Sequence, residues 1–379
     1  IYDYMINYQG GFVRRGLIGE IMYQIFQIHP YSFHTVILYL DLFSWLVLLV
    51  ITARICKEKK LLPIYPLAIF MGTLSYRRDF MMIVIAYYIY LLLIKYITSK
   101  RKSYFVACCA LTILSILIYE PSFFFIVPIS VLIFWNSIKE ESTHYQIRSL
   151  FKAFSLPLVA MLLVCLSKGS NAIASSIWNS WMPLFNYIGK EYQPDHIPAA
   201  INFLERPTGE VIKFHLDLNY HLWDNKCYLY TTGSLFFFII SYYLTTRAPR
   251  KQNAPQQEYL LLSDVYIAQF VCLLPMFSIL SCDFGRTIYY VILTSYMLTY
   301  LLVKNGIQLE VPIIHTISVK MQSLFSHRLF FNNIWCYTVL LFLIPYNIAC
   351  GISIFHPLWN EYEPMLMPKL RIILNIIGL

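Results

Sequence analysis

The feature that most constrains this chain is a succession of apolar runs, each about 17 to 25 residues long, which is the length that crosses the roughly 30 Å hydrocarbon layer of a bilayer. Of the 379 residues, 58% are hydrophobic and only 13% are charged, whereas soluble domains average about half and a quarter. A mean hydropathy of +0.58 excludes an ordinary soluble globule. The sequence therefore predicts an all-α, polytopic integral membrane protein, with residues 1–379 forming a single membrane domain.

About ten transmembrane helices are predicted from these runs. The second run is short and is broken by Pro63 and Pro66, and Pro121 predicts a sharp turn directly after Glu120. The chain opens on a polar stretch, IYDYMINYQGGFVRRGLIGE, so we expect a further helix to precede it. The predicted spans lie near residues 34–55, 61–76, 80–97, 104–120, 121–138, 151–167, 228–246, 259–281, 287–303 and 329–350.

Basic residues give the predicted spans a direction. When the runs alternate through the bilayer, lysine and arginine collect in every second short loop, which is the bias that marks cytoplasmic loops. The net charge of +9 is thus explained by topology and does not indicate nucleic-acid binding. The other, extracytoplasmic side receives the N-terminal segment, three short turns, the stretch from Gly351 and a long loop over residues 168–226, in which we expect short interfacial helices.

Five arginines stand on the predicted outer side, against this bias. Charge near membrane helices costs several kcal/mol unless it is paired or hydrated, and the planar guanidinium matches phosphate oxygens. Each arginine taken singly is as readily a headgroup anchor or the partner of a carboxylate. Adjacent arginine pairs favour a bound anion such as a diphosphate. Two such pairs occur, in GGFVRRGLIGE (10–20) and YRRD (76–79), and CDFGR (282–286) adds a single arginine. The five residues are Arg14, Arg15, Arg77, Arg78 and Arg286.

Acidic residues accompany these arginines. Glu120 ends an apolar run, where burial raises a carboxyl pKa and a nearby arginine lowers it, and such a tunable acid suits a general base. Asp79 and Asp283 are further candidates, and Asp283 could instead orient Arg286 across a turn at Gly285. For each acid, a structural role at a helix end is the alternative.

No metal or cofactor is predicted. The nine cysteines form no CxxC pair, and His215, Asp217 and His221 fit no metal motif. The glycines around Arg14 could present backbone amides to an anion. The spacing there matches neither a Walker loop nor GxGxxG, so direct nucleotide use is not indicated.

The segments GGFVRRGLIGE, YRRD, YEP and CDFGR, set among many spans and one long outer loop, resemble bacterial polymerases of the O-antigen and capsule group within the GT-C class of membrane glycosyltransferases. The resemblance implies transfer of a glycan from undecaprenyl pyrophosphate to a hydroxyl of an acceptor glycan, at the periplasmic face of a bacterial inner membrane. It assigns the five arginines to the diphosphate and Glu120, Asp79 or Asp283 to the base or orienting acid. GT-C enzymes usually place an acid in the first outer loop, where only Asp3 could serve.

Three other functions compete with this one. A flippase for the same lipid-linked glycan would want a continuous charged path and repeat symmetry, but no convincing repeat occurs, and little charge is predicted at mid-membrane besides Asp41 and Asp264. An acyl- or phosphoethanolamine-type transferase would want a catalytic histidine or threonine with metal ligands. A scaffold without catalysis is the third alternative.

Overall fold

The computed structural model describes residues 2–59, 78–167, 169–188, 196–206, 209–214, 216, 242, 256–278, 280 and 284–326. Within these residues the structure is helical and contains no strand, which confirms the all-α prediction for this part of the chain. The elements in chain order are η1 (Tyr2–Met5), α1 (Gly16–Ile28), α2 (Phe33–Lys59), α4 (Asp79–Ser99), α5 (Lys102–Ile118), α6 (Ser122–Asn136), α7 (Thr143–Leu166), α8 (Asn171–Ser180), η3 (Met182–Leu184), α9 (Phe185–Ile188), α10 (Ala199–Asn202), η4 (Phe203–Glu205), α13 (Gln256–Cys272), α14 (Leu274–Ser278), α15 (Phe284–Lys304) and α16 (Pro312–Ser326).

In the part of the chain that the structure describes, three helices are long and apolar enough to cross a membrane: Phe33–Ile55 within α2, Asp79–Ser99 and Thr143–Leu166. Half of the apolar window of α4 is buried inside the protein, but only 22% of that of α7. The outward face of α7 carries large exposed side chains, including Phe151, Leu156 and Leu162. Water would penalise such a continuous apolar face, whereas lipid would not. The described helices are therefore consistent with a helical membrane protein.

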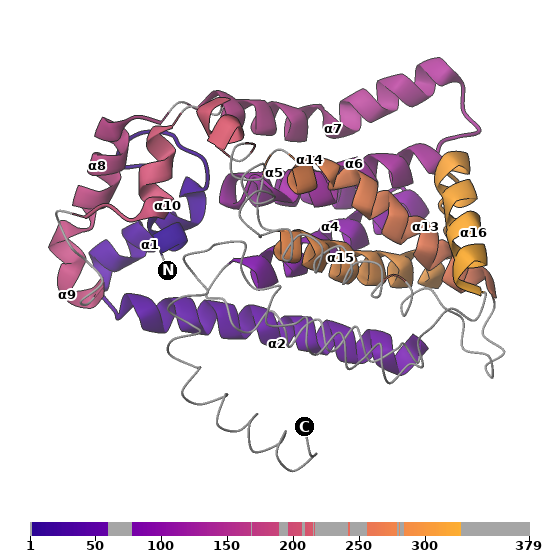
Figure 1. Cartoon of the computed structure of the whole chain (residues 1–379), viewed down its shortest axis with the longest axis horizontal. Coiled ribbons are helices and arrows are strands. Elements are labelled where there is room, and N and C mark those ends of the chain that lie inside the picture. The colour runs from indigo at the N-terminus through magenta and orange to yellow at the C-terminus, as the bar shows by residue number, and fades with distance from the viewer. Residues whose placement is uncertain are drawn as a thin grey trace, which may run out of the picture.

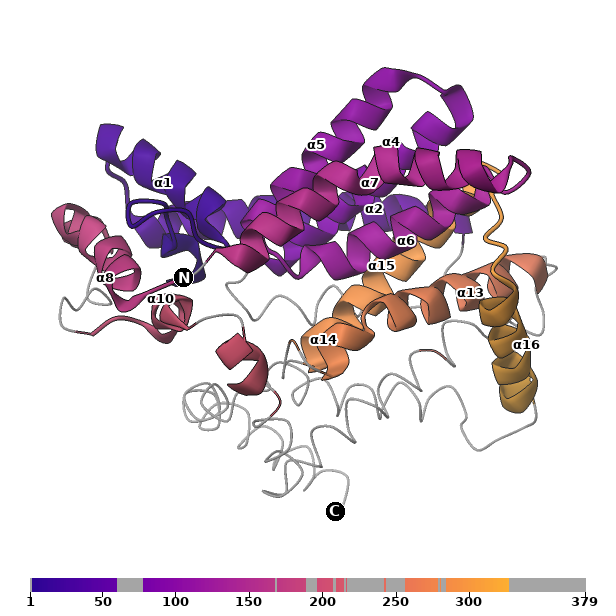
Figure 2. The same ribbon diagram turned by 90° about the horizontal axis from the view of Figure 1, so that it is seen from above.

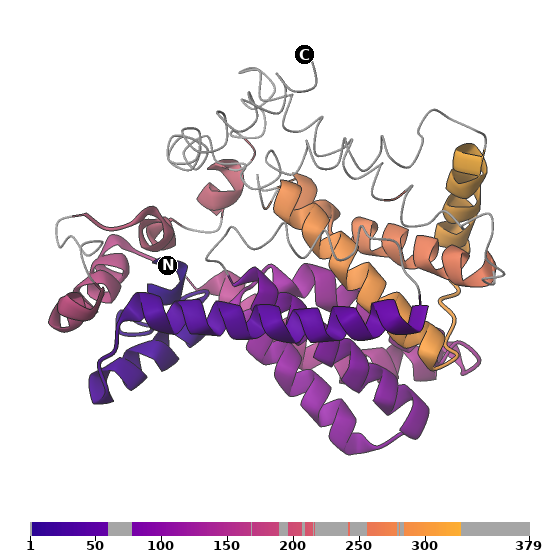
Figure 3. The ribbon, with the colours of Figure 1, turned by 90° about the horizontal axis from the view of Figure 1, so that it is seen from below.

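The long helices lie side by side in a bundle (Figure 1). Helices α4 to α7 pack on one another, and α13 and α15 pack against α6 and α4. Figures 2 and 3 show α13 to α16 on one side of the bundle, with α2 running along its length. The short helices α1, α8, α9 and α10 gather at one end, and α16 crosses the other end (Figure 1).

The helix bounds agree with several predicted spans and differ at others. Pro121 separates α5 from α6, as the sequence predicts. The run predicted at 259–281 is broken, because α13 ends at Cys272 and α14 starts at Leu274, beside Pro275, whose ring disfavours a continuous helix. Helix α16 lies in a segment that was predicted as loop. The predicted spans at 61–76 and 329–350, and all of 228–246 except Tyr242, fall outside the described residues.

The N-terminal segment packs against the start of the 168–226 loop and forms a second core beside the bundle. Trp178 and Trp181 are fully buried there, and the indole N–H of Trp181 donates to the backbone oxygen of Met5 at 2.8 Å. A Cβ on Gly19 would lie 1.9 Å from the backbone oxygen of Ile6, so only glycine allows this close approach. This core fixes the residues that precede α1.

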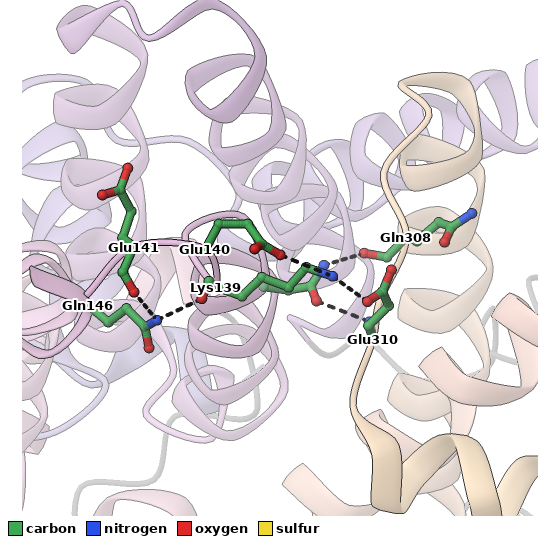
Figure 4. A network of polar contacts seen from close by, with 7 residues as sticks. Lys139, Glu140, Glu141, Gln146, Gln308 and Glu310 are labelled. Carbon is green, nitrogen blue, oxygen red and sulfur yellow. Dashed lines mark hydrogen bonds and ion pairs between the residues drawn. The ribbon is translucent and has the colours of Figure 1, made fainter. Parts of the chain in front are cut away.

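The opposite end of the bundle is held by a polar network around Lys139 (Figure 4). Lys139 pairs with Glu310, and the Asn136 side chain donates to the backbone oxygen of Gln308 at 2.5 Å. These contacts join the α6–α7 turn to the segment between α15 and α16. We call this the lysine end, and we call the end that carries Arg15, Arg78 and Glu120 the arginine end.

Candidate functional site

The arginine end is assembled by three chain segments that are far apart in the sequence. The first leads into α1 through Arg15, which adopts a left-handed backbone conformation with φ of 64°. This conformation is uncommon for a residue with a side chain and marks sites held by their surroundings. The second segment is the start of α4 at Arg78, and the third is the turn at Tyr119 and Glu120 between α5 and α6.

Arg15 and Glu120 form a two-pronged ion pair. The Nε atom of Arg15 donates to both carboxylate oxygens of Glu120 at 2.8 and 3.0 Å, and its Nη2 lies 2.7 Å from Oε1. The side chains are 30% and 15% exposed. Burial by itself raises the pKa of Glu120, but the Arg15 charge and its hydrogen bonds outweigh burial and lower the pKa below its usual value. Glu120 is therefore ionised at neutral pH and committed to Arg15.

Arg78 lies beneath this pair and is only 2% exposed. Its Nη1 donates to the backbone oxygen of Ile118 at 2.6 Å and to that of Arg15 at 3.1 Å, which ties all three segments together. Its guanidinium also stands 5.1 Å above the Tyr4 ring. The Nε and Nη2 atoms are buried and have no hydrogen-bond partner among the described residues. A buried guanidinium with unmet donors is costly.

Arg14 and Asp3 complete the charged group. Arg14 donates from Nη2 to the backbone oxygen of Phe203 at 2.9 Å, so the long loop also contributes to the arginine end. Burial and then the neighbouring Arg15 charge lower the pKa of Arg14. Asp3 is half-buried and close enough for its charge to favour the charged forms of Arg15 and Arg78. This group holds three arginines and two carboxylates, and Asp79 at the start of α4 adds a third carboxylate.

The remaining predicted residues are placed differently. Asp79 begins α4 and accepts a hydrogen bond from the Tyr290 hydroxyl, which links the arginine end to α15. Arg77 and Asp283 fall outside the described residues. Arg286 lies in the first turn of α15, and only its backbone is described.

Several contacting groups could not be found from the sequence. Tyr4 and Tyr119 place their rings against the guanidinium groups of Arg78 and Arg15, at 5.1 and 5.2 Å. Ile118 and Phe203 contribute only backbone oxygens, for which a sequence carries no signal. The one available hint is that Tyr119 adjoins Glu120.

Protein-family profiles, curated proteins and solved structures all give no match to this chain. Among the described residues no group of three or more histidine, cysteine or acidic side chains could hold a metal ion. What the end does offer is clustered guanidinium donors, one of them buried and incompletely bonded. Such donors bind and stabilise oxyanions.

Proposed function

We propose that this protein is a membrane glycosyltransferase of the polysaccharide-polymerase type. It transfers a glycan from undecaprenyl pyrophosphate to a sugar hydroxyl of an acceptor glycan, and the arginine end binds the diphosphate. The proposal includes about ten spans in a bacterial inner membrane, with the arginine end facing the periplasm. The lysine end then faces the cytoplasm, in accord with the lysines that its loops carry.

The observation that carries the proposal is the state of Arg78. A buried guanidinium normally has its donors satisfied, yet Nε and Nη2 of Arg78 lack partners among the described residues. Its only described acceptors are the backbone oxygens of Arg15 and Ile118. A diphosphate would supply the missing acceptors. Departure of the diphosphate concentrates negative charge, which guanidinium groups fixed in advance stabilise more strongly in a dry site than in water.

The carboxylates take different roles in this proposal. Glu120 is a positioning residue, because its bonds to Arg15 hold that guanidinium in place and leave the carboxylate a weak base. The acceptor hydroxyl needs a base within hydrogen-bond reach, worth a factor of roughly 10² to 10⁴. Among the described residues Asp3 and Asp79 are the candidates. Asp3 also lies in the segment where the resemblance to GT-C enzymes places an acid.

A flippase gains no support from the described residues. It would need charge along the length of the bundle. Asp41 instead accepts a hydrogen bond from Tyr4 of the N-terminal segment at 2.8 Å. Asp264 contacts His315 of α16 at the lysine end. The two acids that the sequence suggested at mid-membrane therefore stand near opposite ends.

The proposal is tested with the purified full chain in lipid nanodiscs and a short glycan on undecaprenyl pyrophosphate, without any nucleotide sugar. Product length is read on a gel. We expect a ladder of longer glycans from the wild type. Arg15→Lys and Arg78→Lys should each lower the rate at least tenfold, because a lysine ammonium cannot bind phosphate oxygens with two parallel hydrogen bonds as a guanidinium can.

Glu310→Gln at the lysine end is the matched control and should leave the ladder unchanged. A folded wild type that makes no ladder would overturn the proposed function. Full activity in both arginine variants would overturn the assignment of the diphosphate to the arginine end. If vesicles instead show movement of the lipid-linked glycan across the bilayer without a ladder, the protein is a flippase.

A further inference from the structure

A cavity of about 660 Å³ lies at the lysine end, far from the arginines. It is formed by α13, by the start of α16 and by the segment that connects α15 to α16. Its walls are mainly apolar. The polar residues of the described lining include Asp264, Glu310 and His315 but neither lysine nor arginine. A volume of this size is typical of sites for small organic molecules. The cavity plays no part in the proposed transfer reaction.

Asp264 supplies the charge of this cavity. The residue is 4% exposed, and its Oδ2 lies 3.0 Å from Nδ1 of His315. The other oxygen, Oδ1, is buried and has no hydrogen-bond partner among the described residues. His315 is far more exposed, with 48% of its side chain accessible, so it stands at the open side of the cavity while Asp264 lies deeper.

The other acid of the lining is already engaged. Glu310 pairs with Lys139 from the α6–α7 turn, as Figure 4 shows. The Gln308 backbone oxygen likewise accepts the Asn136 side chain. These contacts hold the wall of the cavity in place, and they leave Asp264 as the lining acid whose carboxylate has an oxygen without a hydrogen-bond partner among the described residues.

We propose that this cavity binds an organic ammonium ion with an apolar body. The ammonium donates to the Asp264 carboxylate, and the apolar part lies against Leu261, Val303 and Ile307. A positively charged donor stabilises a buried carboxylate that lacks one hydrogen-bond partner more strongly than a neutral donor does.

Two other ligand classes fit the lining less well. A metal ion would need several further oxygen, nitrogen or sulfur ligands, and the described residues offer no group of three such side chains. A phospholipid headgroup would bring a phosphate into a cavity whose described lining contains neither lysine nor arginine. The described lining therefore favours an organic amine that carries no phosphate.

The test uses the fluorescent primary amine dansylcadaverine with the full chain in phosphatidylcholine nanodiscs, after subtraction of the signal from empty nanodiscs. We expect saturable binding at one site, displaced by hexylammonium but not by hexanol. The N-acetylated probe, which is neutral, should bind at least tenfold more weakly. Comparing these two probes on the wild type tests the charge without any substitution.

Asp264→Asn keeps the side-chain shape and should weaken dansylcadaverine binding at least tenfold. Glu141→Gln, which changes an exposed acid of the α6–α7 turn that does not line the cavity, should change binding less than twofold. Dihexanoyl phosphatidylethanolamine should not displace the probe. Equal binding of the neutral and charged probes would overturn the proposal, as would undiminished binding to a folded Asp264→Asn variant or displacement by the phospholipid at the concentration of hexylammonium.

Discussion

The ion pair between Arg15 and Glu120 makes a quantitative prediction. Removing one partner of a fully buried pair costs about 3 to 5 kcal/mol, because the other charge is left uncompensated, whereas exposed pairs contribute about 0 to 1 kcal/mol. The side chains here are 30% and 15% exposed, and the contact is two-pronged. Double-mutant cycles on contacting residues give coupling energies of about 0.5 to 3 kcal/mol, and for this partly buried, two-pronged pair we expect a contribution of about 2 kcal/mol to the free energy of unfolding.

The coupling is measured by a double-mutant cycle over Arg15→Ala, Glu120→Ala and the double variant. Each protein is unfolded reversibly by dodecyl sulfate in mixed micelles and followed by tryptophan fluorescence, since Trp178 and Trp181 are fully buried in the core beside Arg15. The Lys139–Glu310 pair, whose side chains are 42% and 53% exposed, provides a matched cycle at the lysine end.

The Arg15–Glu120 coupling should clearly exceed the coupling in the lysine-end cycle. A coupling below about 0.5 kcal/mol, or one no larger than that of the exposed pair, would refute the reasoning that this ion pair fastens the N-terminal segment to the bundle.

Three further predictions concern topology, packing and pH. With the nine native cysteines replaced, Gln9→Cys should react with an impermeant thiol reagent in intact spheroplasts, and Glu140→Cys should react only after permeabilisation. Gly19→Ala should destabilise the fold by about 1 to 3 kcal/mol in the same unfolding assay, because its methyl would overlap the Ile6 backbone oxygen. Folding lowers the pKa of Glu120, so the ionised carboxylate stabilises the fold fully above about pH 4.3, and this stabilisation is lost as the pH falls through the folded-state pKa. The difference in free energy of unfolding between wild type and Glu120→Gln should therefore stay constant from pH 7 to pH 5 and shrink below about pH 4.

Sequence reasoning works well where lipid is the solvent, because an apolar run of fixed length has few folded alternatives. It placed α4 within a few residues and put the α5–α6 turn at Pro121. It missed the break between α13 and α14, although Pro275 stands there, since length alone suggested one helix. It also missed α16. This amphipathic helix lies among basic residues, and the segment was therefore predicted as a cytoplasmic loop.

The charged residues of the arginine end could be named from the sequence, but their pairing could not. Arg15 and Arg78 were predicted from positive charge on the predicted outer side, and Glu120 was predicted from its place at the end of an apolar run. That Glu120 bonds to Arg15 while Arg78 bonds to backbone oxygens depends on how α1, α4 and α5 meet in space. Carbonyl acceptors leave no mark in a sequence, so the incomplete bonding of Arg78 emerged only from the fold.

The central claim, that the arginine end binds a lipid-linked diphosphate, is tested most directly by binding. The full chain in nanodiscs is titrated with undecaprenyl pyrophosphate and with undecaprenyl phosphate, for the wild type and for Arg78→Lys. We predict saturable binding with at least tenfold preference for the diphosphate in the wild type, and loss of that preference in the variant. Equal affinity of the wild type for both lipids, or an unchanged preference in folded Arg78→Lys, would contradict the claim.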